Sequence, residues 1–273
     1  GNIGNPILNL RSSKSKFVII EASSFQLSHS KFIRPNYAIL LNITNDHLDW
    51  HGSMQEYIKA KFKIFNLQGK KDFALINNQF KSAFKKKKFL SRLIPLKLTT
   101  YKRIKNRIKN DYLKSKTNDE NMNFIYTLSK LLKINDKSFV ECMNTFKGLA
   151  HRYEFFLKKK NIKFINDSKA TSFEASKYAL ASCKNIFWIL GGIPKLHDRL
   201  NLKHLKKNII KSYIIGKRVN FFKNQLKKEI NFSVSKRLNN SIIEALRDIK
   251  SLKKRQNTVL LSPSAASFDQ FKN

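Results

Sequence analysis

The stretch Asn42–Phe65, NITNDHLDWHGSMQEYIKAKFKIF, follows a short apolar run, Tyr37–Leu41, whose continuous hydrophobicity is typical of a buried parallel strand. A loop that comes directly after such a strand lies at the edge of the sheet where open α/β folds bind their ligands. Three ionisable residues fall in this loop, namely Asp46, His47 and Asp49. The stretch therefore predicts an α/β fold with a ligand site beyond the strand.

The second half of the stretch has the signals of a helix. Ser53 and Glu56 have the S-x-x-E spacing of a capping box. At about 100° per residue, the apolar residues share one broad face with Lys61 at its centre: Tyr57, Ile58, Ala60, Ile64, Phe65 and Leu67. Burial disfavours a charged amine, so Lys61 either extends its ammonium to solvent or is a neutral nucleophile or an anionic derivative. Helix geometry alone favours the first alternative.

Composition predicts a globular protein with an unusual charge. The 273 residues are 41% hydrophobic and include 22 Phe, enough for a buried core, and no apolar run approaches the roughly 18 residues of a membrane span. Lys and Arg number 55 against 18 Asp and Glu, a net charge of +37. The excess is mostly scattered lysine, without a recognition helix or stacking aromatic residues, so we expect small polyanionic ligands and no specific nucleic acid. A basic nucleic-acid-binding protein is the alternative of a different class.

Two domains are predicted, 1–148 and 149–273. In the first, we expect strands and helices at Phe17–Ile20, Tyr37–Leu41, Phe73–Ile76, Met122–Lys133 and Ser138–Phe146, and only short strands and turns in 80–117. In the second, strands alternate with helices: strands at Ile162–Ile165, Ile186–Leu190, Tyr213–Ile215 and Val259–Leu261, and helices at 173–183, 202–210, 219–229 and 240–250. This alternation predicts a parallel, Rossmann-like sheet.

Polar motifs follow the predicted strands throughout the chain. They begin at Glu21, Asn42, Asp167, Gly191 and Ser262. In a doubly wound domain such positions lie at the carboxyl edge of the sheet and face a cleft. A hard carboxylate such as Glu21 is a suitable magnesium ligand, whereas a helix cap or an ion pair is the structural alternative.

Several of these motifs, in this order, resemble the Mur ligases, ATP-dependent enzymes that form the amide bonds of the peptidoglycan peptide. The resemblance covers almost the whole chain and rests on GNIG (1–4), EASSFQL (21–27), the stretch around His47 and Lys61, GLAHR (148–152), NDSKAT (166–171), GG (191–192) with Lys195, and LLSPSAASFDQFKN (260–273). The SSFQL motif and the ending resemble the D-glutamate-adding branch. The resemblance implies an α/β fold with a parallel-sheet, ATPase-type central domain followed by a Rossmann-like C-terminal domain.

The resemblance also implies a metal site. In the family, the lysine that matches Lys61 is carbamylated by CO2 and helps to hold magnesium, and the matching histidine is His47. Glu21 is the expected third ligand, and two Mg²⁺ sites are expected. Asp46 is a candidate only for supporting these ligands.

Further residues are implied for ATP and the substrates. The nucleotide-binding set is Asn121, Asn118, Arg152, Asp167 and Lys169, and the substrate-binding set is Asn2, Ser23, Thr171, Lys195, Ser267 and Phe268. Ordinary structural roles are the alternatives: a helix N-cap for Asn118 or Asp167, an ion pair between domains for Arg152, and a solvated side chain for Lys195.

The expected activity is ATP-dependent addition of D-glutamate to UDP-N-acetylmuramoyl-L-alanine through an acyl phosphate, by a cytoplasmic monomer. Another amide ligase of the same fold, adding a different amino acid or extending folate, is the nearest alternative. The family's GTNGKST phosphate loop and UDP-binding domain are expected upstream of residue 1, and the chain is expected to be a fragment that catalyses no ligation by itself.

Overall fold

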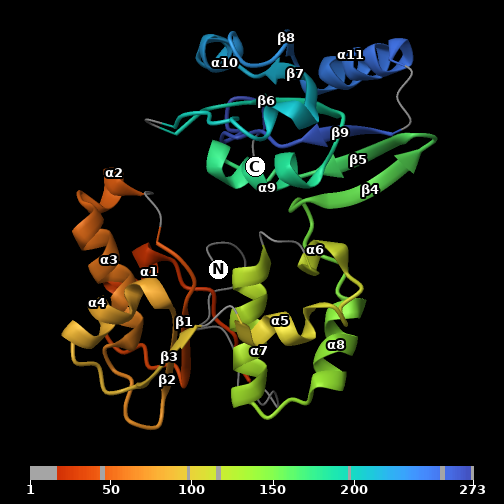
Figure 1. Cartoon of the computed structure of the whole chain (residues 1–273). Helices are drawn as coiled ribbons and strands as arrows, with labels where there is room; N and C mark the ends of the chain where they lie inside the picture. The colour runs from red at the N-terminus through yellow and green to blue at the C-terminus, as the bar shows by residue number, and fades with distance from the viewer. Residues whose placement is uncertain are drawn as a thin grey trace. The chain divides into compact units, whose positions relative to one another are not determined.

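The computed structural model describes residues 17–43, 47–96, 99–114, 118–195, 198–252 and 256–271. The chain forms two compact units, of which the first ends at Thr145 and the second begins at Phe146 (Figure 1). Within the described ranges, no helix combines the length and the apolar character needed to cross a membrane.

The first unit is built on a small parallel sheet in the order β1-β2-β3. Its strands are β1 (Tyr37–Leu40), β2 (Phe73–Asn77) and β3 (Arg92–Leu96). Buried side chains of β1 and β2 pack against three buried phenylalanines, Phe62, Phe65 and Phe84. The helical elements of this part are α1 (Ser24–His29), α2 (Leu48–His51), α3 (Met54–Phe62), η2 (Lys63–Phe65), η3 (Asn78–Phe80) and α4 (Lys81–Lys86).

A helical group with a separate core completes the first unit (Figure 1, yellow to green). It contains α5 (Thr99–Lys105), α6 (Asp111–Lys114), α7 (Asp119–Leu131) and α8 (Asp136–Thr145). The prediction of short strands and turns for 80–117 is therefore correct for β3 but misses the helices α4, α5 and α6. Tyr101, Ile104 and Ile108 are buried at helical spacing, a signal that the many intervening lysines and arginines obscured.

The second unit has a six-stranded sheet in the order β4-β5-β9-β6-β7-β8. The strands are β4 (Glu154–Lys159), β5 (Ile162–Asn166), β6 (Ile186–Gly191), β7 (Ile209–Ile215), β8 (Phe232–Lys236) and β9 (Asn257–Leu261). Only β4 is antiparallel. The helical elements are α9 (Phe173–Ser182), η5 (Lys206–Asn208), α10 (Val219–Leu226) and α11 (Leu238–Ser251).

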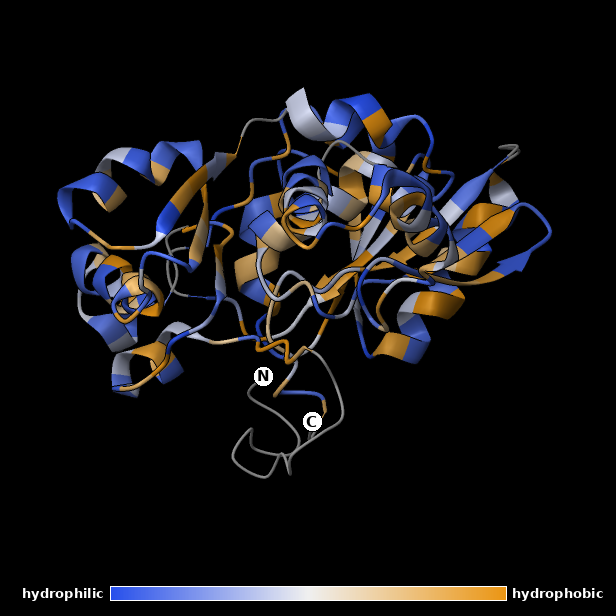
Figure 2. Ribbon diagram, turned by 90° about the horizontal axis from the view of Figure 1, so that it is seen from below, coloured by the Kyte–Doolittle hydropathy of each residue, from blue (hydrophilic) through white to orange (hydrophobic). Residues whose placement is uncertain are grey.

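Two hydrophobic clusters cover the two faces of this sheet. One joins Trp188 and Leu190 to residues of α9 and α10, and the other joins Phe187 and Ile189 to α11. Consecutive residues of β6 therefore point to opposite cores, as expected for a strand buried on both sides. Hydrophobic residues concentrate on the strands, and hydrophilic residues on the outer helix faces and turns (Figure 2).

Two of the expected elements are absent from the described residues, and two strands of the second unit were not predicted. Phe17–Ile20 forms no strand and is exposed, with Ile19 at 95% of its full accessibility. The segment pairs with none of the described strands, β1 included. The helix expected at 202–210 is a single 3-10 turn followed by the start of β7. The edge strands β4 and β8 were not predicted, since an exposed edge lacks the buried apolar run used to find the other strands.

Candidate active site

Lys61 lies in the last turn of α3, where the fold supports its side chain from two sides. Helix α3 begins after Ser53, whose hydroxyl accepts a hydrogen bond of 3.2 Å from the Glu56 N–H. The Lys61 ammonium donates to the carbonyl of Asn42, 3.2 Å away, in the segment that follows β1. It also lies 4.9 Å from the ring centre of the buried Tyr57. The half-buried amine is therefore held near the carboxyl end of β1.

The helical face around Lys61 differs in detail from the prediction. Helix α3 ends at Phe62 and continues as the 3-10 turn η2. Phe62, which the periodicity left off the apolar face, is 1% exposed, whereas Leu67 is 45% exposed. The change from 3.6 to 3.0 residues per turn rotates the residues that follow and accounts for the exposure of Leu67. Phe62 precedes this turn and is buried because it packs in the core cluster with Leu40 and Phe65.

His47 lies against the same tyrosine as Lys61. It is exposed and has left-handed backbone geometry, with φ of 55°, immediately before α2. Its ring centroid is 6.3 Å from that of Tyr57 and 4.9 Å from that of Phe25. The structure thus brings together the histidine and the lysine that were predicted to act together.

His51, at the end of α2, was missed by the sequence analysis. Its Nε2 is 2.9 Å from the hydroxyl of Ser24, and its ring stacks on Phe25 and lies 5.0 Å from Tyr57. Partial burial, together with the neighbouring charges of His47 and Lys61, lowers the pKa of His51. The four-residue spacing from His47 across a helix was the available signal.

Glu21 and Ser23 lie on the segment that leads into α1. Glu21 is exposed and follows an extended segment rather than a strand. Ser23 caps α1: its hydroxyl accepts the Gln26 N–H at 3.2 Å, and its own N–H donates to Gln26 Oε1 at 2.9 Å. Helix α1 packs beside α3, so Glu21 is carried by the element next to the lysine helix. Asn2 and Asp46 lie outside the described residues.

A magnesium site needs oxygen donors, which this group supplies only in part. No three His, Cys, Asp or Glu side chains of the described ranges are grouped as metal ligands. An ammonium cannot bind a cation, but a carbamate on Lys61 would place two anionic oxygens close to His47. The half-buried amine, accessible to CO2 beside a carbonyl acceptor, fits that modification. The residues present therefore fit magnesium only with Lys61 carbamylated.

Asn118 and Asn121 open α7, as predicted. The Asn118 side chain donates to the Tyr112 carbonyl at 2.7 Å and makes no capping hydrogen bond to α7. Asn121 is exposed on the first turn. Of the two, Asn121 therefore has the side chain that is accessible to a ligand.

In the second unit, three loops meet at the carboxyl edge of the sheet. They follow β5, β6 and β9, the central strands. The Gly191 N–H donates to the Pro263 carbonyl at 2.9 Å, and Ile193 and Ala266 exchange two hydrogen bonds of 2.7 and 3.0 Å. These loops carry the predicted nucleotide residue Lys169 and the predicted substrate residues, all exposed or partly exposed: Thr171, Lys195, Ser267 and Phe268.

Asp167 differs from its neighbours because it is only 8% exposed. Its Oδ1 accepts the Tyr153 N–H at 3.0 Å, and its Oδ2 accepts the Ser262 hydroxyl at 2.8 Å. Burial raises the pKa of Asp167, although these hydrogen bonds and the charge of Arg152 act against the rise. Arg152 itself is exposed, and its N–H donates to the Leu149 carbonyl.

Asp198 is a second residue that the sequence analysis missed. Its Oδ2 accepts the N–H of Phe173, the first residue of α9, at 3.0 Å, while the Ser172 hydroxyl caps the same helix. Asp198 thereby ties the loop after β6 to the loop that contains Thr171. Its position three residues after Lys195 was the only signal in the sequence.

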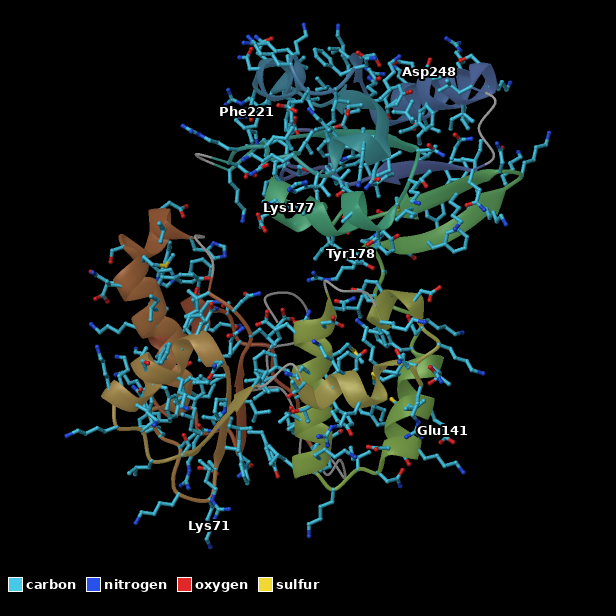
Figure 3. The ribbon with its side chains drawn as sticks, viewed as in Figure 1. Lys71, Glu141, Lys177, Tyr178, Phe221 and Asp248 are labelled. Carbon is cyan, nitrogen blue, oxygen red and sulfur yellow. The ribbon has the colours of Figure 1, made fainter. Side chains whose placement is uncertain are left out.

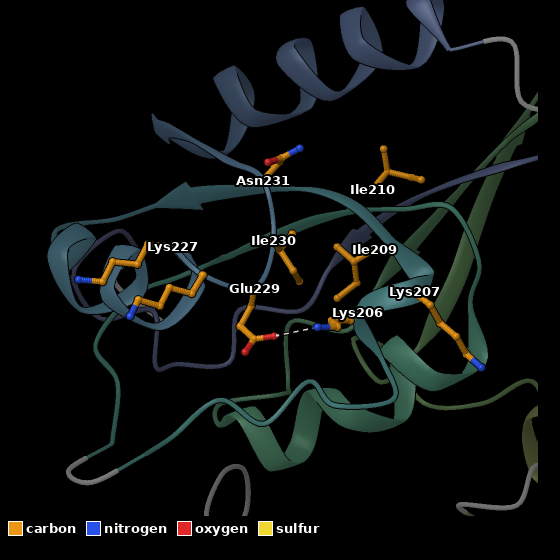
Figure 4. A pocket seen from close by; sticks show the side chains of 9 residues that line it. Lys206, Lys207, Ile209, Ile210, Lys227, Glu229, Ile230 and Asn231 are labelled. Carbon is orange, nitrogen blue, oxygen red and sulfur yellow. Dashed lines mark ion pairs between the residues drawn. The ribbon is translucent and has the colours of Figure 1, made fainter.

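A lysine-rich surface pocket lies at the opposite edge of the second sheet, near the start of β7 (Figure 4). Lys206 pairs with Glu229 at 3.7 Å, whereas Lys207 and Lys227 point away from each other. Because these cations do not converge on one point, the pocket is not a built anion site. A second pocket, at the carboxyl ends of β7 and β8, is lined by Lys217, Lys236 and Asp269 among others.

The model of the Mur ligase middle domain matches residues 3–140, which is half of the sequence. The chain belongs to the Mur ligase family. The expected α/β fold with a parallel sheet is confirmed for this Mur ligase chain.

Relatives of this Mur ligase chain extend over its whole length. A protein of Rickettsia prowazekii named UDP-N-acetylmuramoylalanine--D-glutamate ligase is 34% identical over 100% of the chain, which spans 66% of that relative. The chain therefore covers slightly less than two thirds of the curated relatives it matches. Among solved structures, MurF of Acinetobacter baumannii has a TM-score of 0.63 at 13% identity, covering 87% of the chain and 58% of MurF. MurF of Thermotoga maritima in complex with ADP has a TM-score of 0.52 at 12% identity, covering 85% and 59%.

Proposed function

We propose that the whole protein forms an amide bond between UDP-N-acetylmuramoyl-L-alanine and D-glutamate at the expense of ATP. The observation that carries this proposal is the 34% identity, over the full length of the chain, to a relative named for this reaction. The gathering of His47 and Lys61 around Tyr57 supports it from the structure. Because the proposed substrates are ATP and a UDP-linked sugar, we expect the reaction to take place in the cytoplasm.

The proposed chemistry has two steps. An oxygen of the alanyl carboxylate attacks the γ-phosphorus of ATP, ADP leaves, and an acyl phosphate forms. The neutral amine of D-glutamate then adds to the acyl carbon, and the tetrahedral intermediate expels phosphate to leave the amide. Both steps concentrate negative charge on oxygen atoms, so fixed positive charge near those oxygens lowers the barrier.

Glu21, His47 and carbamylated Lys61 are the proposed magnesium ligands. Bound magnesium would neutralise charge on the phosphoryl oxygens. The chain's own contribution is to hold the Lys61 side chain in place through the Asn42 carbonyl and the Tyr57 ring. His47 is held by its aromatic contacts with Phe25 and Tyr57.

Separate groups are proposed for the nucleotide and for the amino acid. Asn121, Asn118, Arg152 and Lys169 would contact ATP, and the prediction that Asp167 does so stays a prediction. The amino-acid set is Thr171, Lys195, Ser267 and Phe268, and Asn2 with Ser23 would contact the UDP substrate. A lysine and hydroxyl groups suit the two carboxylates of D-glutamate. Lys195 and Ser267 are carried by the loops that Ile193 and Ala266 join.

The acyl phosphate can be tested by isotope transfer. We expect that UDP-N-acetylmuramoyl-L-alanine with ¹⁸O in both carboxylate oxygens passes one labelled oxygen to phosphate, because the attacking oxygen leaves with the phosphoryl group. Mass spectrometry of the phosphate released by the whole enzyme measures the transfer, and unlabelled substrate is the control. Phosphate without the label, formed together with the amide product, would refute this reaction path.

A further inference from the structure

A chain of buried hydrogen bonds runs through the second unit beneath the proposed amino-acid site. The Ser262 hydroxyl lies 2.8 Å from Asp167 Oδ2 and 2.8 Å from the Ser176 hydroxyl, which in turn lies 2.6 Å from the Ser264 hydroxyl. All three serines are 0% exposed. Such a fully connected buried polar network is rigid, because each member would be costly to leave without a partner.

The direction of these hydrogen bonds follows from the number of hydrogens. Each serine hydroxyl has one hydrogen to donate, and an ionised carboxylate can only accept. With Asp167 ionised, Ser262 donates to Asp167, and the single hydrogen of Ser176 goes either to Ser262 or to the Ser172 carbonyl 3.3 Å away. We call Asp167 and the three hydroxyl groups the Asp167–serine chain.

The Asp167–serine chain joins two consecutive elements, β5 and α9, to the segment after β9, which is far from both in the sequence. Asp167 follows β5, Ser176 lies in α9, and Ser262 and Ser264 follow β9. Backbone bonds strengthen the link: the Ser264 N–H donates to the Ala170 carbonyl at 2.9 Å, and the Asp167 N–H to the Leu261 carbonyl at 2.7 Å.

Ser264 also holds an unfavourable backbone conformation. Its φ is 58°, in the left-handed region that residues other than glycine adopt at a cost. The hydroxyl contact with Ser176 and the amide contact with Ala170 are the interactions that hold Ser264 in this conformation. The direction of the polypeptide backbone after Ser264, toward Ser267 and Phe268, depends on this turn.

We propose that Asp167, Ser262, Ser176 and Ser264 are positioning residues that fix the spacing between the loop of Lys169 and Thr171 and the loop of Ser267 and Phe268. This inference rests on the proposed function, since those two loops carry the groups assigned to the amino acid. Asp167 fixes the loop spacing from inside the fold, because both of its oxygens already accept hydrogen bonds from the protein. Its effect on the amino acid is exerted through the loops.

Ser176→Ala is the first test, because alanine favours the helix α9 and removes the central hydroxyl of the Asp167–serine chain, together with its hydrogen bond to the Ser172 carbonyl within the same helix. In the whole enzyme we expect the KM for D-glutamate to rise by about tenfold or more, since misplaced binding groups lose affinity and rate. The KM for the UDP substrate should change by less than about twofold. Ser262→Ala, which removes the direct partner of Asp167, should have the larger effect on the D-glutamate KM.

Asp248→Asn is the matched control. Asp248 is also a carboxylate with two donors, the Tyr213 hydroxyl at 2.6 Å and the Lys211 ammonium at 2.8 Å. It lies on α11, which packs on the other face of the sheet from α9 (Figure 3). We expect Asp248→Asn to lower stability without raising the KM for D-glutamate.

Hydrogen exchange provides a readout that needs no substrate. The amide of Ser264 should exchange faster in Ser176→Ala and in Ser262→Ala than in the wild type, and at the wild-type rate in Asp248→Asn. Unchanged exchange at Ser264, or an unchanged KM for D-glutamate in both serine variants, would overturn the inference. A wild-type enzyme that does not use D-glutamate would instead overturn the proposed function, and the exchange rates would still decide whether the Asp167–serine chain holds the loop.

Discussion

Replacing Lys61 with alanine is expected to lower the ligation rate of the whole enzyme by about a thousandfold or more, the scale of losing a group that stabilises charge in the transition state. The variant removes the only side chain of α3 that is held beside the Asn42 carbonyl and over the Tyr57 ring among the described residues. ATP-dependent phosphate release in the presence of both substrates is the measurement. Added short-chain carboxylates should restore part of the rate by replacing the carbamate oxygens.

Lys59→Ala is the control for this prediction. Lys59 lies on the same helix, but its ammonium is exposed and pairs with Glu56 at 3.4 Å. Its loss should leave the rate within about twofold of the wild type, as expected for an exposed ion pair. Full activity of Lys61→Ala, or equal losses in both variants, would refute a role for a Lys61 carbamate. A carbamate signal in ¹³C spectra of wild type supplied with labelled CO2, absent from Lys61→Ala, is an independent check.

Gly191→Ala is expected to destabilise the second unit by at least ~4 kcal/mol, near the upper end of single substitutions. A Cβ at this position would lie 2.0 Å from the carbonyl oxygen of Ile215 on the neighbouring strand. The φ of 137° adds strain for any residue with a side chain. Because β6 and β7 are paired at this point, neither backbone can move without breaking the ladder. Urea unfolding followed by circular dichroism measures the loss.

Gly148→Ala separates the two causes. Gly148 also has positive φ, 86°, but a Cβ there would meet no atom within 4 Å. We expect a loss of only about 1 kcal/mol, the cost of the left-handed conformation alone. Equal losses at both glycines would show that backbone conformation, and not the close approach of β6 to β7, requires Gly191.

The sequence could predict the elements whose burial shows in their composition as a run of apolar residues. The apolar runs of β2, β6 and β9 were found because consecutive residues of these strands, and therefore both of their faces, are buried. The edge strand β4 was not found, since its sequence does not alternate between apolar and polar residues, and Phe155 and Phe156 are both more than half exposed. Phe17–Ile20 has the composition of a strand but no described partner, and hydrogen bonding to a partner cannot be read from composition.

The part of the candidate site that could be predicted is the set of loops that directly follow strands. The loops after β5, β6 and β9 meet at one edge because parallel strands end there, and this much follows from the predicted strands. Within those loops, Thr171, Lys195 and Ser267 were chosen from the resemblance to the Mur ligases. Contacts between side chains of different elements could not be predicted from the sequence. The contact of His51 with Ser24 and that of Asp167 with Ser262 depend on how loops fold back, which no local pattern specifies.

Competition among amino acids tests whether the enzyme selects D-glutamate. The whole enzyme is given ATP, UDP-N-acetylmuramoyl-L-alanine and an equimolar mixture of D-glutamate, L-glutamate, L-lysine and meso-diaminopimelate, and the products are identified by mass and by chiral analysis after hydrolysis. We expect D-glutamate to be incorporated in about hundredfold excess or more, because the proposed pocket pairs fixed donors with the two carboxylates of an amino acid of D configuration. Equal use of L-lysine or meso-diaminopimelate, or no amide product with any of the four, would contradict it.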